Sequence, residues 1–202
     1  DIAGLRVILG VDRMDYTKGL IERLRGVEQF YDTYPEFKKK SIFVQVAAPS
    51  REAVLKYQQY AKQVLLEVER INNKLQTNTW RPILFLHKQV KQEDLIYLYR
   101  EAEACLVTSL HDGMNLVAKE YVAQHKDKGV LILSEFTGAA RELHSALIIN
   151  PYATNDIADA LYQAFTMDNA ERKSRLDAMR SKIVQYNIFR WVADIFDSLL
   201  SK

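Results

Sequence analysis

The sequence predicts an α/β protein with a Rossmann-like parallel sheet that carries helices on both faces. Six short apolar segments recur along the chain, and each is followed by a stretch in which apolar residues have helical spacing. This alternation requires parallel strands, because a connection through a helix returns the chain to the same edge of the sheet. Short continuous apolar runs are typical of strands that are covered on both faces.

The predicted strands are short and apolar. In chain order they are Arg6–Gly10, Ile42–Ala47, Ile83–Leu86, Ala104–Val107, Val130–Leu133 and Leu147–Ile149. The apolar spacing after them predicts helices at Leu20–Thr33, Arg51–Leu75, Gln92–Ala102, Asn115–His125, Ala139–Leu143 and Asn155–Met167. Two further helices, Asn169–Gln185 and Ile188–Leu200, are separated by a break near residues 186 and 187.

One large domain over residues 1–202 is indicated by the length and by a composition of 48% hydrophobic and 27% charged residues. The formal net charge is only +2, so we expect no nucleic-acid partner and no membrane partner. No apolar run approaches the ~20 residues that cross a bilayer, and a signal-peptide pattern is absent.

The single cysteine, Cys105, lies in an apolar segment and is expected to be a buried structural thiol. One cysteine allows no disulfide within the chain, which fits a cytoplasmic protein. The sequence begins with Asp1 and not with methionine, so we expect it to be a piece of a longer protein.

The stretch Ser109–Glu120 is the strongest candidate for a ligand site. It joins a predicted strand to a helix through a turn at Gly113, and ligands bind at the carboxyl ends of strands in open α/β sheets. The backbone amides of Asn115, Leu116 and Val117 are expected to be first-turn donors. Together with the helix dipole, they suit a phosphate group.

Two carboxylates, Asp112 and Glu120, bracket this anion pocket. Because these carboxylates would repel a phosphate, they are better explained as acceptors for the hydroxyl groups of a ligand that also has a phosphate, such as a sugar nucleotide. Glu120 lies one helical turn after Leu116, where it can face a ribose, and Asp112 would face the transferred sugar. A turn residue and a solvated helix carboxylate are the alternative interpretations.

Cations follow the first two predicted strands at the same edge. No dinucleotide-binding glycine fingerprint and no Gly-Lys-Ser or Gly-Lys-Thr phosphate loop is present. Arg13 and Lys18 can instead neutralise a diphosphate without a metal ion, since arginine offers a planar fork and lysine a mobile charge. Arg51 follows the second strand. His87 lacks partners at ligand spacing, so we predict no metal site, and we find no nucleophile and base of the triad kind.

Four motifs, in order and each extending beyond the carboxyl end of a predicted strand, carry a family resemblance. They are Gly10–Gly19, Gln45–Arg51, His111–Tyr121 and Gly129–Ala140. Together they resemble the trehalose-6-phosphate synthases over nearly the whole chain. The resemblance implies the C-terminal, donor-binding half of a two-domain glycosyltransferase of the GT-B architecture, with the N-terminal acceptor domain absent from this chain. The implied reaction moves glucose from UDP-glucose to glucose 6-phosphate with retention, and releases UDP. This half is expected to bind the donor and to be inactive alone.

The resemblance also implies roles for individual residues. Arg13 and Lys18 correspond to the family's diphosphate clamp, Asp112 to its contact with the donor glucose, and Glu120 to its ribose contact. Arg51 corresponds to a contact with the acceptor phosphate. Further donor contacts are expected from Val90, which lies in the uracil region, and from Gly113, Met114, Asn115, Leu116 and Val117. Many relatives have arginine where this sequence has His111, so the resemblance assigns no role to that side chain.

The implied mechanism uses Arg13, Lys18 and Asp112. Cations fixed at the departing diphosphate stabilise the transition state, and the departing phosphate takes the acceptor's proton. Asp112 then positions the sugar and is not a nucleophile. No metal or cofactor is expected, since UDP-glucose is a substrate.

Partner proteins follow from the same resemblance. The full-length protein is expected to be an oligomer or to form a complex with a trehalose-6-phosphate phosphatase. One alternative is a non-catalytic regulatory or sugar-phosphate-sensing subunit, which would be expected to have lost charges at the clamp. Another is a related nucleotide-sugar transferase with a different acceptor.

Overall fold

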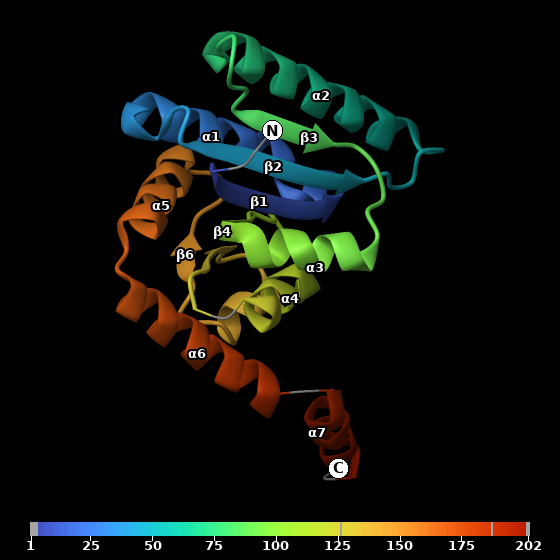
Figure 1. Ribbon diagram of the computed structural model, residues 1–202. Coiled ribbons are helices and arrows are strands. Elements are labelled where there is room, and N and C mark those ends of the chain that lie inside the picture. Colours follow the sequence, from blue (N-terminus) through green and yellow to red (C-terminus); the bar gives the residue numbers. More distant parts are fainter. Residues whose placement is uncertain (1–3, 126, 187, 201–202) are drawn as a thin grey trace.

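The computed structural model describes residues 4–125, 127–186 and 188–200, in which a six-stranded parallel sheet lies between two layers of helices (Figure 1). The strands are β1 (Arg6–Arg13), β2 (Ser41–Ala48), β3 (Ile83–Leu86), β4 (Ala102–Val107), β5 (Val130–Ser134) and β6 (Leu147–Ile149). The α-helices are α1 (Leu20–Thr33), α2 (Leu55–Leu75), α3 (Gln92–Glu101), α4 (Leu116–Gln124), α5 (Thr154–Thr166), α6 (Asn169–Gln185) and α7 (Ile188–Leu200). Short 3-10 helices lie in the connections at η1 (Tyr16–Lys18), η2 (Pro35–Phe37) and η3 (Gly138–Arg141).

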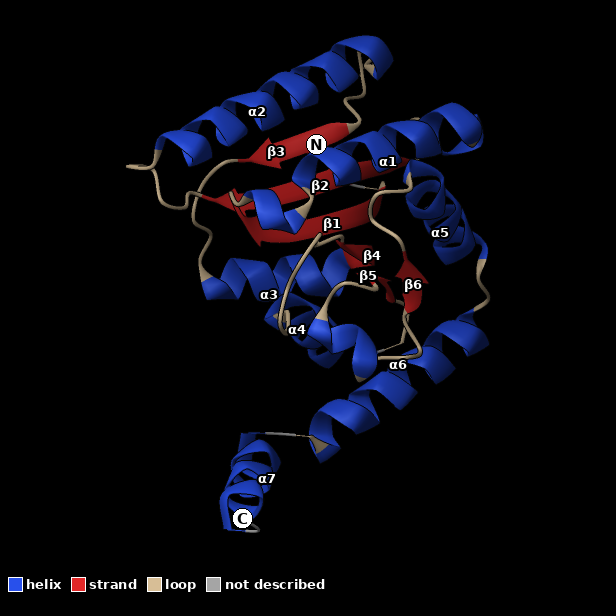
Figure 2. Cartoon of the chain, turned by 180° about the vertical axis from the view of Figure 1, so that it is seen from behind, coloured by secondary structure: helices blue, strands red, loops and turns tan. Residues whose placement is uncertain are grey.

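The strand order is β3-β2-β1-β4-β5-β6, and every neighbouring pair is parallel. The order reverses between β1 and β4, so the connections that leave these two strands diverge. Such a reversal opens a crevice outside the carboxyl ends of the strands. The predicted fold class is confirmed, with helices on both faces of the sheet (Figure 2).

Each face of the sheet has its own hydrophobic core. Ile8 and Phe43 belong to the core under α1, α2 and α5, whereas Leu9 and Val44 belong to the core under α3, α4 and α6. Neighbouring residues of a strand therefore bury opposite faces, which explains why the strands are apolar throughout. The Cys105 thiol is fully buried, and burial raises its pKa to about 12, as expected for a structural cysteine.

Several predicted boundaries differ from the structure by one to four residues, and three differences affect residues near the sheet edge. β1 extends to Arg13, so this side chain leaves the end of a strand and not a loop. The helix predicted from Arg51 begins at Leu55, because Arg51 has a left-handed φ of 49° that a helix cannot accommodate. The short helix predicted at Ala139–Leu143 is the 3-10 helix η3.

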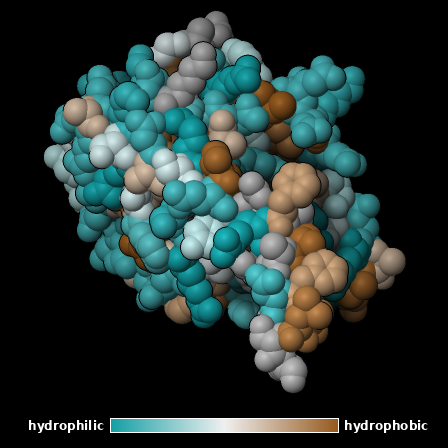
Figure 3. Space-filling view, turned by 90° about the horizontal axis from the view of Figure 1, so that it is seen from below, coloured by the Kyte–Doolittle hydropathy of each residue, from teal (hydrophilic) through white to brown (hydrophobic). Residues whose placement is uncertain are grey.

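The last helix, α7, lies away from the sheet beyond the end of α6 (Figures 1 and 2). Its Phe189, Phe196 and Leu199 side chains are exposed. The view from below shows hydrophobic residues gathered on this part of the surface (Figure 3). No described helix is both long enough and apolar enough to cross a membrane. The break predicted before α7 falls partly on residue 187, which lies outside the described residues.

Candidate functional site

A cavity of about 550 Å³ opens beside the carboxyl ends of β1 and β2 and the start of α4. It brings together the following residues that the sequence analysis selected: Arg13, Lys18, Val90, Asp112, Met114, Asn115, Leu116, Val117 and Glu120. Gly113 belongs to the same turn. The lining also includes residues that the sequence analysis did not select: Val11, Asp12, Val46, Ala48, Gln89, Leu95 and Tyr99.

The connection after β1 is held against the turn after β4. Gly19 has a left-handed φ of 63°, and a Cβ at this position would lie 2.3 Å from the Thr108 carbonyl oxygen. Only glycine fits there without displacing the backbone. The Leu110 amide donates to the Thr17 carbonyl over 2.8 Å, and the Asp15 carboxylate accepts from the Thr17 amide over 3.0 Å. These contacts place Lys18 beside the turn that contains Asp112.

Lys18 and Asp112, predicted as separate contacts, form one ion pair. Lys18 Nζ lies 2.6 Å from Asp112 Oδ2, and each side chain is 15% exposed. Asn115 Nδ2 donates to the same carboxylate oxygen over 3.0 Å. Burial opposes ionisation of Asp112, but Lys18 and Asn115 outweigh it and hold the pKa of the carboxyl below its usual value. Asp112 is therefore charged at neutral pH.

Arg13 is the more accessible cation of the predicted clamp. Its side chain is 58% exposed, and the nearest carboxylate oxygen in its salt bridge, on Asp15, lies 3.9 Å away. Such a distant and solvated pair holds arginine weakly, so the guanidinium is available to an anion in the cavity.

The start of α4 provides the predicted amide donors. Asn115 is the N-cap, with a φ of 82°, and its Oδ1 accepts from the Ala118 amide over 3.0 Å. The helix therefore begins at Leu116 and not at Asn115. Within the described part of the chain, no hydrogen bond engages the amides of Asn115, Leu116 and Val117. These donors and the positive end of the helix dipole favour an anion in the cavity.

The last residues of the Gly129–Ala140 motif, which follow β5, contact this turn. The Gly138 amide donates to the Asp112 carbonyl over 2.9 Å, and the Ala139 amide donates to the Met114 carbonyl over 2.8 Å. A Cβ at Gly138 would lie 2.0 Å from the Gly113 carbonyl oxygen, so the close approach requires glycine. The Gly129–Ala140 motif thus acts by positioning the turn.

A buried polar network lies beneath the cavity and was missed at the sequence level. Arg23 is fully buried, and its Nη1 donates to the Asp12 carboxylate and, over 2.8 Å, to Gln45 Oε1. Its Nε donates to Thr108 Oγ1 over 2.9 Å. A Cβ at Gly10 would lie 2.5 Å from Arg23 Nη1, so the glycine provides the space. The network ties the ends of β1 and β2 to the end of β4.

Tyr99, which was missed at the sequence level, contacts the predicted ribose contact Glu120. Glu120 is exposed on α4, and the Tyr99 hydroxyl donates to its Oε2 over 2.9 Å.

Arg51, the predicted contact for the acceptor phosphate, does not line the cavity. Its Nη1 donates to the Tyr57 hydroxyl over 3.0 Å, and its guanidinium carbon lies 5.4 Å from the centre of the Tyr57 ring. His87 lines a neighbouring cavity with Tyr57.

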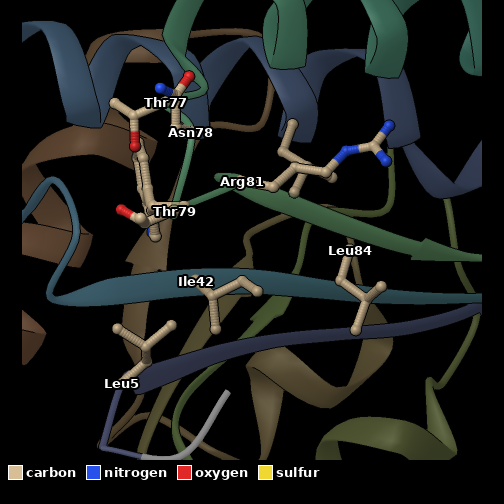
Figure 4. A pocket seen from close by; sticks show the side chains of 9 residues that line it. Leu5, Ile42, Thr77, Asn78, Thr79, Arg81 and Leu84 are labelled. Carbon is tan, nitrogen blue, oxygen red and sulfur yellow. The ribbon is translucent and has the colours of Figure 1, made fainter. Parts of the chain in front are cut away.

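A separate cavity of about 360 Å³ lies at the opposite edge of the sheet (Figure 4). Its lining comes from the beginnings of β2 and β3, from Leu5 before β1 and from the Thr77–Arg81 turn. No residue that the sequence analysis selected is among its lining residues. Over residues 4–125, 127–186 and 188–200, no group of three or more His, Cys, Asp or Glu side chains is placed to hold a metal ion.

Comparison with known proteins gives consistent matches. The family model described as glycosyltransferase family 20 matches residues 2–201. The 56 kDa subunit of the UDP-forming alpha,alpha-trehalose-phosphate synthase of Saccharomyces cerevisiae is 43% identical over 200 residues, which cover 98% of this chain and 40% of that protein.

Two solved structures have closely similar folds. One is a protein from E. coli bound with UDP-2-fluoro glucose, with 42% identity and a TM-score of 0.95 over 98% of this chain and 44% of that one. The other is a UDP-forming alpha,alpha-trehalose-phosphate synthase from Burkholderia xenovorans in complex with glucose-6-phosphate, with 40% identity and a TM-score of 0.95 over the same shares, 98% and 44%.

The chain thus spans less than half the length of these relatives, which it covers by 40% and 44%. The match to the family model, by contrast, extends over almost all of the chain. The chain therefore belongs to glycosyltransferase family 20.

Proposed function

We propose that this chain is the donor-binding half of a trehalose-6-phosphate synthase. One observation carries the proposal: a single cavity gathers two cations, an exposed carboxylate and three amides that have no acceptor within the described part of the chain. Two solved relatives support UDP-glucose and glucose 6-phosphate as the ligands, since one structure contains a fluorinated UDP-glucose and the other contains glucose-6-phosphate. In the longer protein, glucose passes from UDP-glucose to glucose 6-phosphate with retention, and trehalose 6-phosphate and UDP are formed.

In this proposal the donor's parts occupy successive sections of the cavity. The diphosphate binds Arg13, Lys18 and the amides at the start of α4. The ribose binds Glu120, one turn further along that helix, and the uracil lies near Val90. The glucose lies toward Asp112, which is already fixed in place by Lys18 and Asn115.

The chemistry follows from the charge that the reaction creates. Cleaving the bond between glucose and the diphosphate leaves negative charge on UDP, and donors already fixed at that position stabilise the transition state. The acceptor hydroxyl forms the new bond to the glucose, and its proton passes to the departing phosphate. Asp112 positions the glucose. No metal ion or cofactor takes part in this proposal.

We propose that the full-length protein is an oligomer or works in a complex with a trehalose-6-phosphate phosphatase, which is supported by the description of the yeast relative as a subunit. A cytoplasmic location is supported by the single, buried Cys105.

The assay that tests this function uses the longer protein that contains the chain. Release of UDP from UDP-glucose is expected only when glucose 6-phosphate is present, with trehalose 6-phosphate as the product. Transfer to another acceptor would identify a related nucleotide-sugar transferase. Binding of UDP-glucose without turnover would favour a non-catalytic sensing subunit, although Arg13, Lys18, Arg51, Asp112 and Glu120 are all present.

Glu120→Gln is expected to weaken UDP binding by about 1–2 kcal/mol, because the neutral amide loses the charge assistance of the carboxylate toward the ribose hydroxyls. Binding of inorganic diphosphate, which has no ribose, is expected to stay unchanged or to become tighter. Calorimetric titration measures both ligands. Glu101→Gln makes the same charge change on an exposed residue outside the cavity and serves as the control. Equal losses for UDP and diphosphate would make Glu120 a structural residue.

A further inference from the structure

Tyr99 lies where the core meets the candidate site. Its side chain is 2% exposed and belongs to the core under α3, α4 and α6, yet it also lines the cavity. Its hydroxyl donates to Glu120 Oε2 over 2.9 Å. The two residues come from neighbouring helices, α3 and α4, so a rigid core residue contacts an exposed carboxylate.

The Tyr99 ring is held firmly. It packs edge to face against Tyr121, with ring centres 6.4 Å apart and planes inclined by 72°. Burial raises the pKa of the Tyr99 hydroxyl well above its usual value, and the nearby carboxylate of Glu120 adds to this effect. The hydroxyl therefore stays protonated at neutral pH, where it can donate to Glu120.

Tyr121 shows what a purely structural tyrosine does in the same core. Its hydroxyl is fully buried and donates to the Ala102 carbonyl over 3.0 Å, so it satisfies a backbone group. Tyr99 instead directs its hydroxyl to Glu120, a side chain that would otherwise sample several rotamers in solvent. Fixing such a side chain costs conformational entropy. Because the bond from Tyr99 already fixes Glu120, the protein does not lose this entropy when a ligand binds.

We propose that Tyr99 is a positioning residue that orients the Glu120 carboxylate toward the ribose hydroxyls. Oε2 accepts from Tyr99, and within the described part of the chain no hydrogen bond engages Oε1. One carboxylate oxygen thus anchors the group while the other serves the sugar. Preference for a ribose over a sugar without hydroxyls depends on this anchor. The inference rests on the proposed function, in which Glu120 is the ribose contact.

The test compares UDP with 2′,3′-dideoxy-UDP, which keeps the uracil and the diphosphate but lacks both ribose hydroxyls. Calorimetry on the 202-residue chain measures the ratio of the two affinities for the unsubstituted protein, Tyr99→Phe, Glu120→Gln and the double variant. Tyr99→Phe is expected to lower UDP affinity roughly three- to tenfold and to leave dideoxy-UDP affinity unchanged. The double variant is expected to lose little more than Glu120→Gln alone, because both substitutions remove the same interaction.

Tyr121→Phe is the matched control. It removes a buried hydroxyl from the adjacent ring, so it is expected to lower stability without changing the affinity ratio. If Glu120→Gln lowers the ratio and Tyr99→Phe does not, the positioning role is wrong and the proposed function stands. Equal losses for both ligands in Tyr99→Phe would likewise show a structural role only. If the unsubstituted chain binds the two ligands equally, the ribose contact itself is wrong, and this inference fails with it.

Discussion

Replacing Arg23 with methionine is expected to lower the free energy of unfolding by roughly 3–5 kcal/mol, because the substitution leaves a buried carboxylate without its cation. The Arg23 side chain is 0% exposed and that of its partner, Asp12, is 3% exposed. Gln45 Oε1 and Thr108 Oγ1 would also lose the hydrogen bonds that this guanidinium donates to them. Methionine fills most of the volume, so the loss reports the charge and the hydrogen bonds more than a cavity.

Urea denaturation measures this effect against a control on the same helix. Arg25 lies two residues later, is 59% exposed and contacts Glu67 over 2.9 Å. Arg25→Met is expected to cost less than about 1 kcal/mol, as is usual for surface ion pairs. Adding Asp12→Asn to Arg23→Met is expected to recover part of the loss, since no charge is then buried alone. Similar losses for the two arginine variants would show that the network contributes little.

Arg51→Ala in the longer protein is expected to raise the KM for glucose 6-phosphate roughly ten- to a hundredfold, or about 1.5–3 kcal/mol. A dianionic phosphate loses a bidentate guanidinium in this variant. The UDP affinity of the 202-residue chain is expected to stay unchanged, because Arg51 lies outside the donor cavity and contacts Tyr57. Steady-state kinetics and calorimetry measure the two quantities.

Two variants control the Arg51 experiment. Arg51→Lys is expected to restore the acceptor KM only in part, since an ammonium keeps the charge but not the planar fork. Arg81→Ala removes an arginine from the opposite edge of the sheet and is expected to change neither quantity (Figure 4). An unaltered acceptor KM in Arg51→Ala would remove the acceptor role. If Arg51→Ala lowered the UDP affinity as much as Arg13→Ala does, the acceptor role of Arg51 would also be wrong.

Most of the fold could be predicted because its determinants are local. Apolar runs such as those of β4 and β5 are buried on both faces, and this burial pattern shows directly in the residue types. The predicted start of α2 was wrong because Arg51 has a left-handed conformation, which no property of arginine favours. Arg23 could have been noticed, since it lies among the apolar positions Leu20, Leu24 and Val27 of a helix.

The sequence predicted most of the residues that form the site but not which of them contact one another. Motif positions and strand ends place Lys18, Asp112 and Glu120 at one edge of the sheet. The Lys18–Asp112 ion pair joins residues that are 94 positions apart, and it depends on the close approach at Gly19. The bond from Tyr99 to Glu120 depends on how α3 packs beside α4. Such pairings follow from tertiary packing, which local patterns do not contain.

In the proposed function, Arg13, Lys18 and the start of α4 bind a diphosphate without a metal ion. Calorimetric titration of the 202-residue chain with UDP, in the presence of a chelator and again with added Mg²⁺, tests it most directly. The UDP affinity is expected to be the same in both conditions and to fall roughly tenfold or more when Arg13 is replaced by alanine. UDP binding that vanishes with the chelator and returns with Mg²⁺, or that is indifferent to Arg13→Ala, would contradict this proposal.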